Sequence, residues 1–431
     1  MHRRKTHRLP HPPALETALS WCNGFDDAML LCSHNLQTGV KDPYGSFDML
    51  VAAGSLEELP TYGDPFPGLS RFHAAHKDWL FGHLSYDLKN QIHGLSSRNP
   101  DRIGFPEIRF FRPRFVLTVQ GEDCLLHTIE HENTTAIEEA LACLSTSQPV
   151  TAGPTETPSI QHKIDRTSYL EKATELLRHI QQGDIYEVNL CMESFAENCT
   201  IDPCQTFLKL QSASPMPYAA FYRNESRYLL CASPERYLAK RNEKLISQPI
   251  KGTIRRGRSA EEDSQLADQL RNDPKERSEN IMITDLVRND LSRVASRGSV
   301  AVESLLELKT FPRIHQLVTT ISAAVEKDID WTEALRHTFP MGSMTGAPKR
   351  SAMQLIDQFE ESRRGLYSGC VGYITPEGDF DFNVVIRSIQ YNAESGYLSL
   401  MAGSALTAGC DPEKEYAECQ LKAETMLRAL D

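Results

Sequence analysis

Residues 183–192, Gly-Asp-Ile-Tyr-Glu-Val-Asn-Leu-Cys-Met, decide the fold class of this chain. Every second side chain from Tyr186 to Met192 is large and apolar, whereas those between them, beginning with Glu187, are shorter or polar. This period of two is typical of a β-strand. Gly183 suits the left-handed C-cap that ends a helix. The stretch therefore predicts a helix that stops at a glycine and a strand that follows at once.

The neighbouring segments extend this pattern of helices and strands. Asp165 suits the N-cap of a helix whose apolar positions 170, 173, 176, 177 and 180 share one face. Residues 109–117 and 227–232 are apolar or alternating runs that we expect to be strands. Because these elements come in mixed blocks rather than in strict alternation, they favour the α+β class with large antiparallel sheets over a doubly wound sheet.

The amino-acid composition indicates one linker, which separates two segments of the chain. Residues 144–160 are rich in Ser, Thr, Pro and Gly and have no periodicity, as in a linker. A chain of 431 residues is also too long for one ordinary core. We therefore expect an N-terminal segment over residues 1–150 and a C-terminal domain over residues 160–431, which carries the sharper chemical motifs.

The net charge restricts the partners of the chain. It has 46 Lys and Arg against 58 Asp and Glu, a net charge of −12. Such an acidic chain argues against nucleic acid as the main partner, because phosphate binding needs basic patches. An anionic substrate would need a locally positive site. The chain contains no apolar run of about 18 residues, so we expect no membrane span.

The N-terminus and the cysteines indicate a cytoplasmic protein. Residues 1–8 are basic, but Leu-Pro-His-Pro-Pro follows at 9–13 in place of the apolar stretch of a secretory signal. The 11 cysteines contain no Cys-x-x-Cys pair, so their spacing fits neither a zinc site nor a redox pair. Reduced thiols in the cytosol are the simplest account.

Two predicted helices carry paired glutamates. Each begins at an Asp-Pro pair, at residues 273–274 and 411–412. The pairs, each three residues apart and so on one helix face, are Glu276 with Glu279 and Glu415 with Glu418. A capping box at Glu276 and an exposed ion pair of Glu418 with Lys422 are the plain interpretations. The alternative is that both pairs converge on Mg²⁺, which prefers oxygen ligands.

A loop and two cations complete the chemical motifs. Pro348 suits the first turn of a helix closed by Gly365, and free amides at 345–347 would then point at an anion, although a plain turn is as plausible. Arg387 lies in an apolar strand and needs either an ion pair or a ligand carboxylate. Lys251, between Pro-Ile and Gly-Thr, is either a partner for a carboxylate or a nucleophile whose pKa is lowered by burial.

These motifs, in this order, resemble the chorismate-utilising enzymes, which include anthranilate, aminodeoxychorismate, isochorismate and salicylate synthases. The motifs are residues 183–189, Ser233-Pro234-Glu235-Arg236, residues 285–291 (Asp-Leu-Val-Arg-Asn-Asp-Leu), the 345–349 loop (Thr-Gly-Ala-Pro-Lys) and the 415–422 helix. The resemblance covers about residues 165–431, and the N-terminal part resembles the first segment of the family only loosely. It implies a four-layer β/α/α/β sandwich with two large antiparallel sheets around the active site.

The resemblance also implies the roles of individual residues. Mg²⁺ would be bound by Glu279 and Glu418, with Glu276 and Glu415 nearby. The remaining implied substrate contacts are Tyr373, Arg387, Lys422 and the backbone near Gly403 for the carboxylates of chorismate, and Thr345 and Gly346 near its enolpyruvyl group. Glu235 matches the general acid that protonates the departing 4-hydroxyl, a role that needs a shielded carboxyl.

Position 251 separates the branches of the family. Anthranilate synthases usually carry Ala there, whereas aminodeoxychorismate synthases carry a Lys that attacks C2 of the ring before ammonia attacks C4. The resemblance therefore implies amination of chorismate, with ammonia from a separate glutamine amidotransferase subunit. Glu187 argues against the water-adding branches, which have a lysine base at that position. The alternatives are an anthranilate synthase component and a non-catalytic chorismate-binding subunit.

Three positions depart from the family pattern. Amine-forming members usually have Gln where this chain has Glu187. The histidine that precedes Leu-Val in the family is replaced by Gln316, and Ala405 stands where Gly is common. We expect these departures to alter the surroundings of Lys251.

Overall fold

The structure is a computed structural model that describes residues 4–34, 42–146, 153, 157–326 and 328–431. Its strands form a continuous, antiparallel hydrogen-bonded system that divides into two large sheets. The long strand β5 (Ile108–Gln120) belongs to both, because its residues 108–111 pair with β4 and its residues 115–120 pair with β6. The predicted α+β class with large antiparallel sheets is confirmed.

The first sheet combines strands from both ends of the chain. Its order is β1 (Arg4–Arg8), β6 (Asp123–Ile129), β5, β3 (Met49–Glu58), β2 (Asp27–Cys32), β9 (Tyr218–Asn224), β10 (Arg227–Ser233), β19 (Ser388–Asn392), β20 (Tyr397–Thr407) and β8 (Glu187–Ala196). Two short strands, β7 (Gln161–His162) and β16 (Gly346–Ala347), add to β8.

The second sheet continues from the first half of β5. Its order is β4 (Leu80–Leu84), β17 (Cys370–Ile374), β18 (Phe380–Asn383), β11 (Arg236–Arg241), β12 (Lys244–Gln248) and β15 (Ile314–Ala324). Beyond β12, the strand β13 (Ile250–Arg255) pairs with the same side of β15, and β14 (Ala301–Thr310) pairs with its other side.

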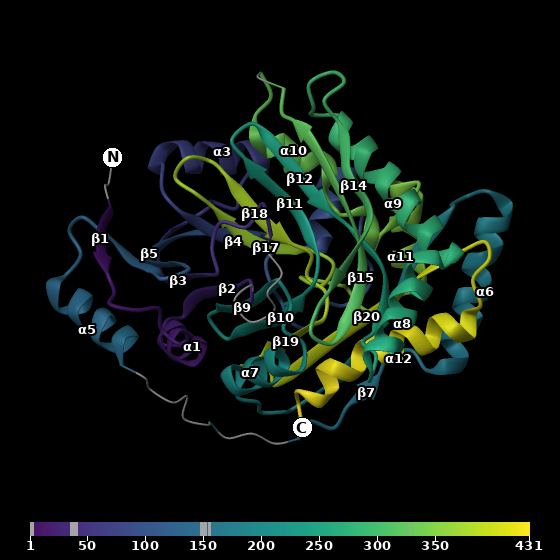
Figure 1. Cartoon of the computed structure of the whole chain (residues 1–431), viewed down its shortest axis with the longest axis horizontal. Helices are drawn as coiled ribbons and strands as arrows, with labels where there is room; N and C mark the ends of the chain where they lie inside the picture. The colour runs from purple at the N-terminus through teal and green to yellow at the C-terminus, as the bar shows by residue number, and fades with distance from the viewer. Residues whose placement is uncertain (1–3, 35–41, 147–152, 154–156, 327) are drawn as a thin grey trace.

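The two sheets face each other, and helices cover their outer faces (Figure 1). The first sheet is covered by α1 (Leu15–Asn23), α5 (Thr134–Ser145), α6 (Arg166–Gln182), α7 (Pro203–Ala213), α11 (Lys349–Phe359) and α12 (Pro412–Arg428). The second is covered by α3 (Pro65–His76), α8 (Ala260–Asn272), α9 (Pro274–Ser292) and α10 (Trp331–Thr338). The short helix α4 (Lys89–His93) follows β4.

Strand alternation explains this order of layers. In β2, Met29 faces the opposite sheet, whereas Leu30 faces the helices. In β9, Tyr222 faces the opposite sheet and Phe221 faces the helices. The four layers and the two sheets are as expected, but the implied order β/α/α/β is wrong. The order is α/β/β/α, because the strands have apolar side chains on both faces and bury both.

The N-terminal and C-terminal segments share both sheets. Strand β2 pairs with β9, and β4 pairs with β17. The two segments are therefore joined by hydrogen-bonded strands rather than by a small interface. The linker expected over residues 144–160 lies partly outside the described residues.

Helix starts follow the predicted capping residues. The carboxylate of Asp165 accepts a hydrogen bond from the amide of Ser168 at the start of α6, and Gly183 ends α6 with a left-handed backbone. Asp273 and Asp411 cap α9 and α12, each directly before a proline. The helix after Pro348 differs from the prediction, because it ends at Phe359 rather than at Gly365.

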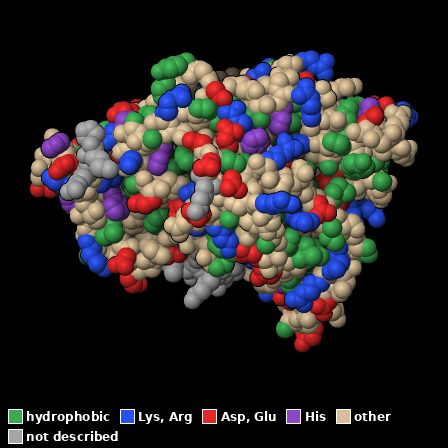
Figure 2. Space-filling model, turned by 90° about the horizontal axis from the view of Figure 1, so that it is seen from above, with side chains coloured by type: hydrophobic (Ala, Val, Ile, Leu, Met, Phe, Trp, Pro, Cys, Tyr) green, Lys and Arg blue, Asp and Glu red, His purple; other side chains and the backbone are tan. Residues whose placement is uncertain are grey.

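The molecular surface carries both signs of charge. On the face in Figure 2, Asp and Glu are interspersed with Lys and Arg, and no continuous basic surface is visible there. Among the described residues, no helix combines the length and the apolar character that crossing a bilayer requires.

Candidate active site

A cavity of about 390 Å³ lies where the two sheets, α9 and α12 meet. Strand β13 contributes Ile250, Lys251, Gly252 and Thr253, and β15 contributes Ile314 and Gln316. The opposite wall comes from β8, β20 and α12, including Asn189, Gly403 and Glu418. Its volume is that of a pocket for a small organic molecule. Most sequence-predicted site residues meet in this cavity.

Lys251 lies in the cavity wall between carboxylates. Its Nζ is 3.0 Å from Glu187 Oε1 and 3.9 Å from Glu279 Oε2. Burial alone would lower the pKa of Lys251, but the charges of Glu187 and Glu279 outweigh it and raise that pKa. The expectation of a lysine with a lowered pKa is therefore wrong. A nucleophilic Lys251 must first give its proton to a neighbour, and Glu187 is the one in contact.

Glu235 is a shielded carboxyl at the turn between β10 and β11. It is 4% exposed, and its Oε1 accepts a hydrogen bond of 2.7 Å from the hydroxyl of Ser343. Burial raises the pKa of Glu235 to about 7, although Ser343 and Lys251 act in the opposite direction. A carboxyl with this pKa is partly protonated near neutral pH, as a general acid must be.

Three of the four predicted metal ligands line the cavity: Glu276, Glu279 and Glu418. Burial and the charge of Glu418 raise the pKa of Glu276. Burial also raises the pKa of Glu279 to about 7. Its Oε1 is buried without a hydrogen-bond partner among the described residues. Crowded carboxylates with raised pKa values fit a cation.

The donor set suits Mg²⁺ rather than a metal enclosed by protein. Within the described ranges, no three His, Cys, Asp or Glu side chains come together as a metal site. Mg²⁺ does not need three, because it usually takes one or two carboxylates and completes its shell with water and substrate. Glu279 and Glu418 are oxygen donors that meet this requirement.

Glu415 lies behind the cavity rather than in its wall. It is 1% exposed, accepts a hydrogen bond from Ser404, and pairs with Lys275 Nζ at 2.5 Å. Lys275 Nζ is also 3.7 Å from Glu279 Oε1. Glu415 therefore holds a lysine beside the carboxylates, and sequence spacing did not reveal that lysine.

Two cations are available for an anionic substrate. Arg387 is half-buried in the cavity wall, and this partial burial lowers its pKa. Of the described acidic residues, none forms an ion pair with it; its guanidinium donates only to the carbonyl of Lys422 at 3.4 Å. Lys422 Nζ contacts Glu418 at 2.6 Å and donates to the carbonyl of Gly403 at 2.8 Å. Arg387 is thus a cation of this wall without a carboxylate partner in the described chain, whereas Lys422 shares its charge with Glu418.

Gly403 is required by its neighbours. A Cβ atom at this position would lie 2.3 Å from Asn189 Oδ1 and 2.5 Å from Cys191 Sγ. Any larger residue would therefore push β20 away from β8 or fill the cavity. The predicted place of Gly403 at the substrate site is consistent with this close approach.

The 345–347 loop does not form the expected anion site. Thr345 is fully buried, its amide donates to the carbonyl of Gly342, and its hydroxyl donates to that of Met341. Gly346 and Ala347 form β16 against β8. Their backbone is therefore used within the fold, and Thr345 and Gly346 lie behind the wall. Ser343, on the 3₁₀ turn η2 (Gly342–Met344) just before them, lines the cavity instead.

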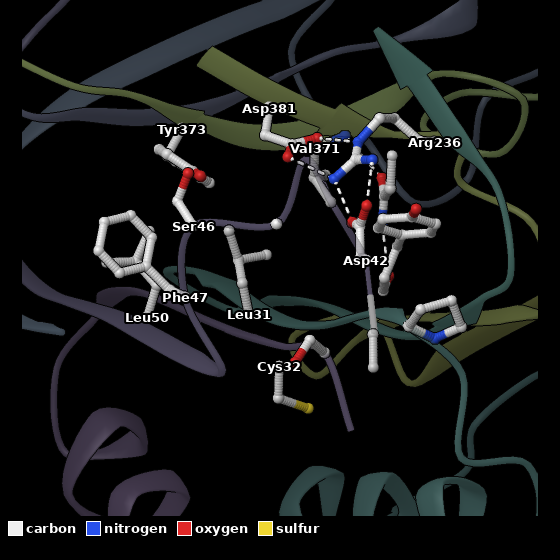
Figure 3. Close-up of a pocket in the computed structure, with 16 residues that line it drawn as sticks. Leu31, Cys32, Asp42, Ser46, Phe47, Leu50, Arg236, Val371, Tyr373 and Asp381 are labelled. Atoms are coloured by element: carbon white, nitrogen blue, oxygen red, sulfur yellow. Dashed lines mark hydrogen bonds and ion pairs between the residues drawn. The ribbon is translucent and has the colours of Figure 1, made fainter. Parts of the chain in front are cut away.

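Tyr373 also lies elsewhere. It lines a second cavity between the sheets, beside Ser46, Phe47 and Asp381 (Figure 3). Tyr367, six residues earlier, lines the active-site cavity together with Arg387. Tyr373 pairs along β17, whereas Tyr367 lies in the turn before that strand. One tyrosine lies just before β17 and the other within it, and the sequence pattern alone did not show which one reaches the cavity.

Comparison with known proteins identifies the family. The profile described as "chorismate binding enzyme" matches residues 43–428. This chain belongs to the chorismate binding enzyme family. It is therefore an enzyme that acts on chorismate, and the cavity is its candidate active site.

Relatives within the chorismate binding enzymes include two branches. The chain is 32% identical over 424 residues to aminodeoxychorismate synthase component 1 of Escherichia coli (strain K12), covering 92% of each. It is 33% identical over 363 residues to anthranilate synthase component 1 of Thermus thermophilus, covering 82% of this chain and 77% of the relative. It is 39% identical over 269 residues to a probable chloroplastic aminodeoxychorismate synthase of Oryza sativa subsp. japonica, covering 62% of this chain but only 30% of the rice protein.

Solved structures show the same fold. Anthranilate synthase component I of Streptococcus pneumoniae TIGR4 superposes with a TM-score of 0.77 at 24% identity, covering 90% of this chain and 93% of its own. The menaquinone-specific isochorismate synthase of Escherichia coli superposes with a TM-score of 0.79 at 20% identity, covering 100% and 95%. At these identities the likeness shows the fold and not the reaction.

Proposed function

We propose that this chain is component I of an aminodeoxychorismate synthase, which converts chorismate and ammonia to 4-amino-4-deoxychorismate through a lysine adduct. The observation that carries the proposal is Lys251, whose Nζ lies in the cavity wall 3.0 Å from Glu187. An amine in the wall of a substrate cavity, with an acceptor for its proton in contact, is the arrangement of a nitrogen nucleophile. Relatives named aminodeoxychorismate synthase support this branch.

Substrate binding uses the two cations that face the cavity. The guanidinium of Arg387 has no carboxylate partner in the described chain, so a substrate carboxylate satisfies it without breaking an internal ion pair. Lys422, beside Gly403, offers a second positive charge. This arrangement holds a dianion and leaves its ring between Lys251 and Glu235.

The first chemical step needs a neutral lysine and a protonated acid. Lys251 passes a proton to Glu187, and its nitrogen then bonds to C2 of the ring. The ring double bond shifts and the C4–O bond breaks. Glu235, whose pKa is raised to about 7, supplies the proton with which the hydroxide leaves as water.

The second step returns the enzyme to its first state. Ammonia bonds to C4, the double bond shifts back, and the C2–N bond to Lys251 breaks. The nitrogen at C4 loses one proton, which the ionised Glu235 is placed to accept. The amine of Lys251 recovers its proton from Glu187.

Mg²⁺ would be held by Glu279 and Glu418, with Glu276 nearby, and would supply a positive charge for a substrate carboxylate. Ammonia would come from a separate glutamine amidotransferase subunit.

Product identity tests the function. Purified chain would be mixed with chorismate, ammonium chloride and Mg²⁺, and the products separated with and without the lyase that releases pyruvate from aminodeoxychorismate. We expect 4-amino-4-deoxychorismate alone, and para-aminobenzoate once the lyase is added. Anthranilate with pyruvate in the absence of the lyase would identify the other branch and overturn the proposal. Chorismate binding without turnover would indicate a non-catalytic subunit.

The adduct has its own test. Chorismate without ammonia would be added to the chain, and the intact mass measured after rapid quenching. We expect a mass increase of chorismate less one water, located on the peptide that contains Lys251. A Lys251→Arg variant keeps the positive charge between Glu187 and Glu279 but removes the nucleophile, so it should show no increase. An equal increase in that variant would place the adduct elsewhere.

A further inference from the structure

A buried ion pair lies behind the wall of the active-site cavity. Arg364 is 2% exposed and Glu360 is 4% exposed. Arg364 Nη2 lies 2.6 Å from Glu360 Oε1, and Arg364 Nε donates to Glu360 Oε2 at 3.0 Å. A pair buried this deeply is weak evidence for stability alone, because removing two charges from water costs about as much free energy as their attraction returns. The other contacts of the pair therefore indicate what it does.

The remaining hydrogen bonds of this pair hold two segments that line the cavity. Arg364 Nη1 donates to the carbonyl of Met344 at 2.6 Å, and Nη2 donates to the carbonyl of Asn189 at 2.9 Å. Met344 is in η2 and Asn189 is in β8, and both residues line the cavity. Glu360 Oε1 also accepts a hydrogen bond of 2.9 Å from the amide of Cys191 in β8. A planar guanidinium binds such acceptors in one orientation, so the pair fixes η2 relative to β8.

Ser343 is the residue of η2 that contacts the general acid. Its hydroxyl donates to Glu235 Oε1 at 2.7 Å. Its carbonyl accepts a hydrogen bond of 3.3 Å from Asn189 Nδ2, and the next residue in the chain is Met344. Asn189 and Met344 are the two residues whose carbonyls Arg364 binds. The position of the Ser343 hydroxyl thus depends on groups that Arg364 holds.

We propose that Arg364 and Glu360 are positioning residues for the general acid, which keep the hydroxyl of Ser343 on the carboxyl of Glu235. This inference rests on the proposed function, in which Glu235 protonates the leaving hydroxide and later accepts a proton. Burial raises the pKa of Glu235, and the hydrogen bond from Ser343 opposes that rise by stabilising the ionised form. Glu235 can therefore both give up a proton and take one back near neutral pH.

The other charged groups near Glu235 are held by different contacts. Lys251 on β13 lowers the pKa of Glu235. On the side of α9, Asp290 and Tyr237 line a small cavity with Glu235, and Asp290 is paired with Lys349 at 2.6 Å. Within the described chain, no ion pair or hydrogen bond links these groups, or those of the active-site cavity, to the buried pair, so a change in the pair reaches Glu235 through η2. The further titratable side chains of the active-site cavity are Arg255, Glu276, Glu279, Tyr367, Arg387, Glu418, Lys422 and Glu424.

Three substitutions test the inference through the alkaline limb of kcat against pH. Ser343→Ala removes the donor, so Glu235 should keep its proton to higher pH, and the limb should move up by about half a unit to one unit, the effect of one hydrogen bond. Glu360→Gln removes the charge that orients the guanidinium but keeps a carbonyl for the amide of Cys191. Arg364→Lys keeps the charge but has one nitrogen for all three acceptors. Both should move the limb in the same direction as Ser343→Ala.

A double variant and a matched control separate positioning from stability. Combining Glu360→Gln with Ser343→Ala should leave the limb where Ser343→Ala alone places it, because both changes remove the same hydrogen bond. Arg112→Lys is the control, because Arg112 is 4% exposed, is paired with Asp78 at 2.9 Å and lies outside the wall of the active-site cavity. It should lower the melting temperature and leave the limb at its wild-type pH.

The inference and the proposed function fail separately. An unmoved limb in Ser343→Ala, or in folded Glu360→Gln and Arg364→Lys, would overturn the inference. So would shifts that add in the double variant, or an equal shift in Arg112→Lys. A wild-type chain that makes anthranilate would overturn the proposed function, but the kcat profile of that reaction would still show whether the pair positions Glu235.

Discussion

Two arginines, one buried and one half-buried, line two cavities of the same fold and differ in their partners. Arg236 in the second cavity is 1% exposed and contacts Asp42 Oδ2 at 2.6 Å and Asp381 Oδ2 at 2.9 Å (Figure 3). Arg387 in the active-site cavity has no such partner among the acidic residues described. Arg236 needs no ligand, because two aspartates of the chain neutralise its charge. Arg387 keeps its charge for something that is not part of the chain.

The difference shows how the fold separates structure from function. Charged groups with internal partners hold elements together, as Arg236 does for β11, β18 and the segment at Asp42. Arg387, a charge without an acidic partner among the described residues, lies instead in the active-site cavity. Substitutions in the two cavities should therefore change different measurements.

The largest loss of activity is expected from Lys251→Ala. Removing the nucleophile should lower kcat by about 10³-fold or more, since a single catalytic group supplies up to about 10⁴-fold. The residual rate would come from direct attack of ammonia on C4. Amination would be followed by product chromatography, and the melting temperature by calorimetry. A variant with wild-type kcat would contradict a covalent role, whatever its stability.

The two arginines provide the direct comparison. Arg387→Gln should raise the KM for chorismate by about 10²-fold, as expected for a lost charge-assisted contact, and leave the melting temperature nearly unchanged. Arg236→Gln should instead destabilise the fold by about 3 kcal/mol, the lower end for a broken buried pair, because Arg241 remains 2.5 Å from Asp381.

Denaturant unfolding and steady-state kinetics on both variants decide the matter. The comparison is broken if Arg387→Gln unfolds as early as Arg236→Gln, or if Arg236→Gln raises the KM for chorismate while its stability is normal. Either result would mean that internal pairing does not distinguish structural from ligand-binding arginines in this fold.

The sequence could predict much of this site because its signals are local. The caps at Asp273 and Asp411 depend on two or three adjacent residues, so the helices that carry Glu279 and Glu418 were predictable. The strand pattern around Glu187 was equally local. The order of the layers was not, because alternation along a strand indicates one apolar face and does not show that the other face is covered as well.

The errors in the site have the same origin. Thr345 and Ser343 are two residues apart in one turn, and only the pairing of β16 with β8 decides which faces the cavity. The pKa of Lys251 depends on Glu187, which is 64 positions away in the chain. Burial without that partner predicts the opposite direction. Long-range contacts, rather than composition, decide both points.

A pH profile should reveal the shielded acid. Glu235 must be protonated in the first step, and its pKa is about 7, so kcat should fall as pH rises through about 7. Glu279, whose pKa is also about 7, must lose its proton to bind a metal, so activity should fall on the acidic side too. Raising the Mg²⁺ concentration should move only the acidic limb. In Glu235→Gln the alkaline limb should disappear, and a profile that keeps it would assign the acid elsewhere.

The smallest expected effects come from the two tyrosines, and they test the comparison most finely. Tyr367→Phe removes a hydroxyl beside Arg387 in the active-site cavity, so kcat/KM should fall about three- to tenfold, the range of one hydrogen bond. Tyr373→Phe changes only the second cavity, where the ring packs on Phe47 and Trp79, and should leave kcat/KM within about twofold. Both variants keep the ring, so packing is matched between them. A loss in Tyr373→Phe larger than that in Tyr367→Phe would mean that the second cavity communicates with the active site, and the division between a structural cavity and a catalytic one would no longer hold.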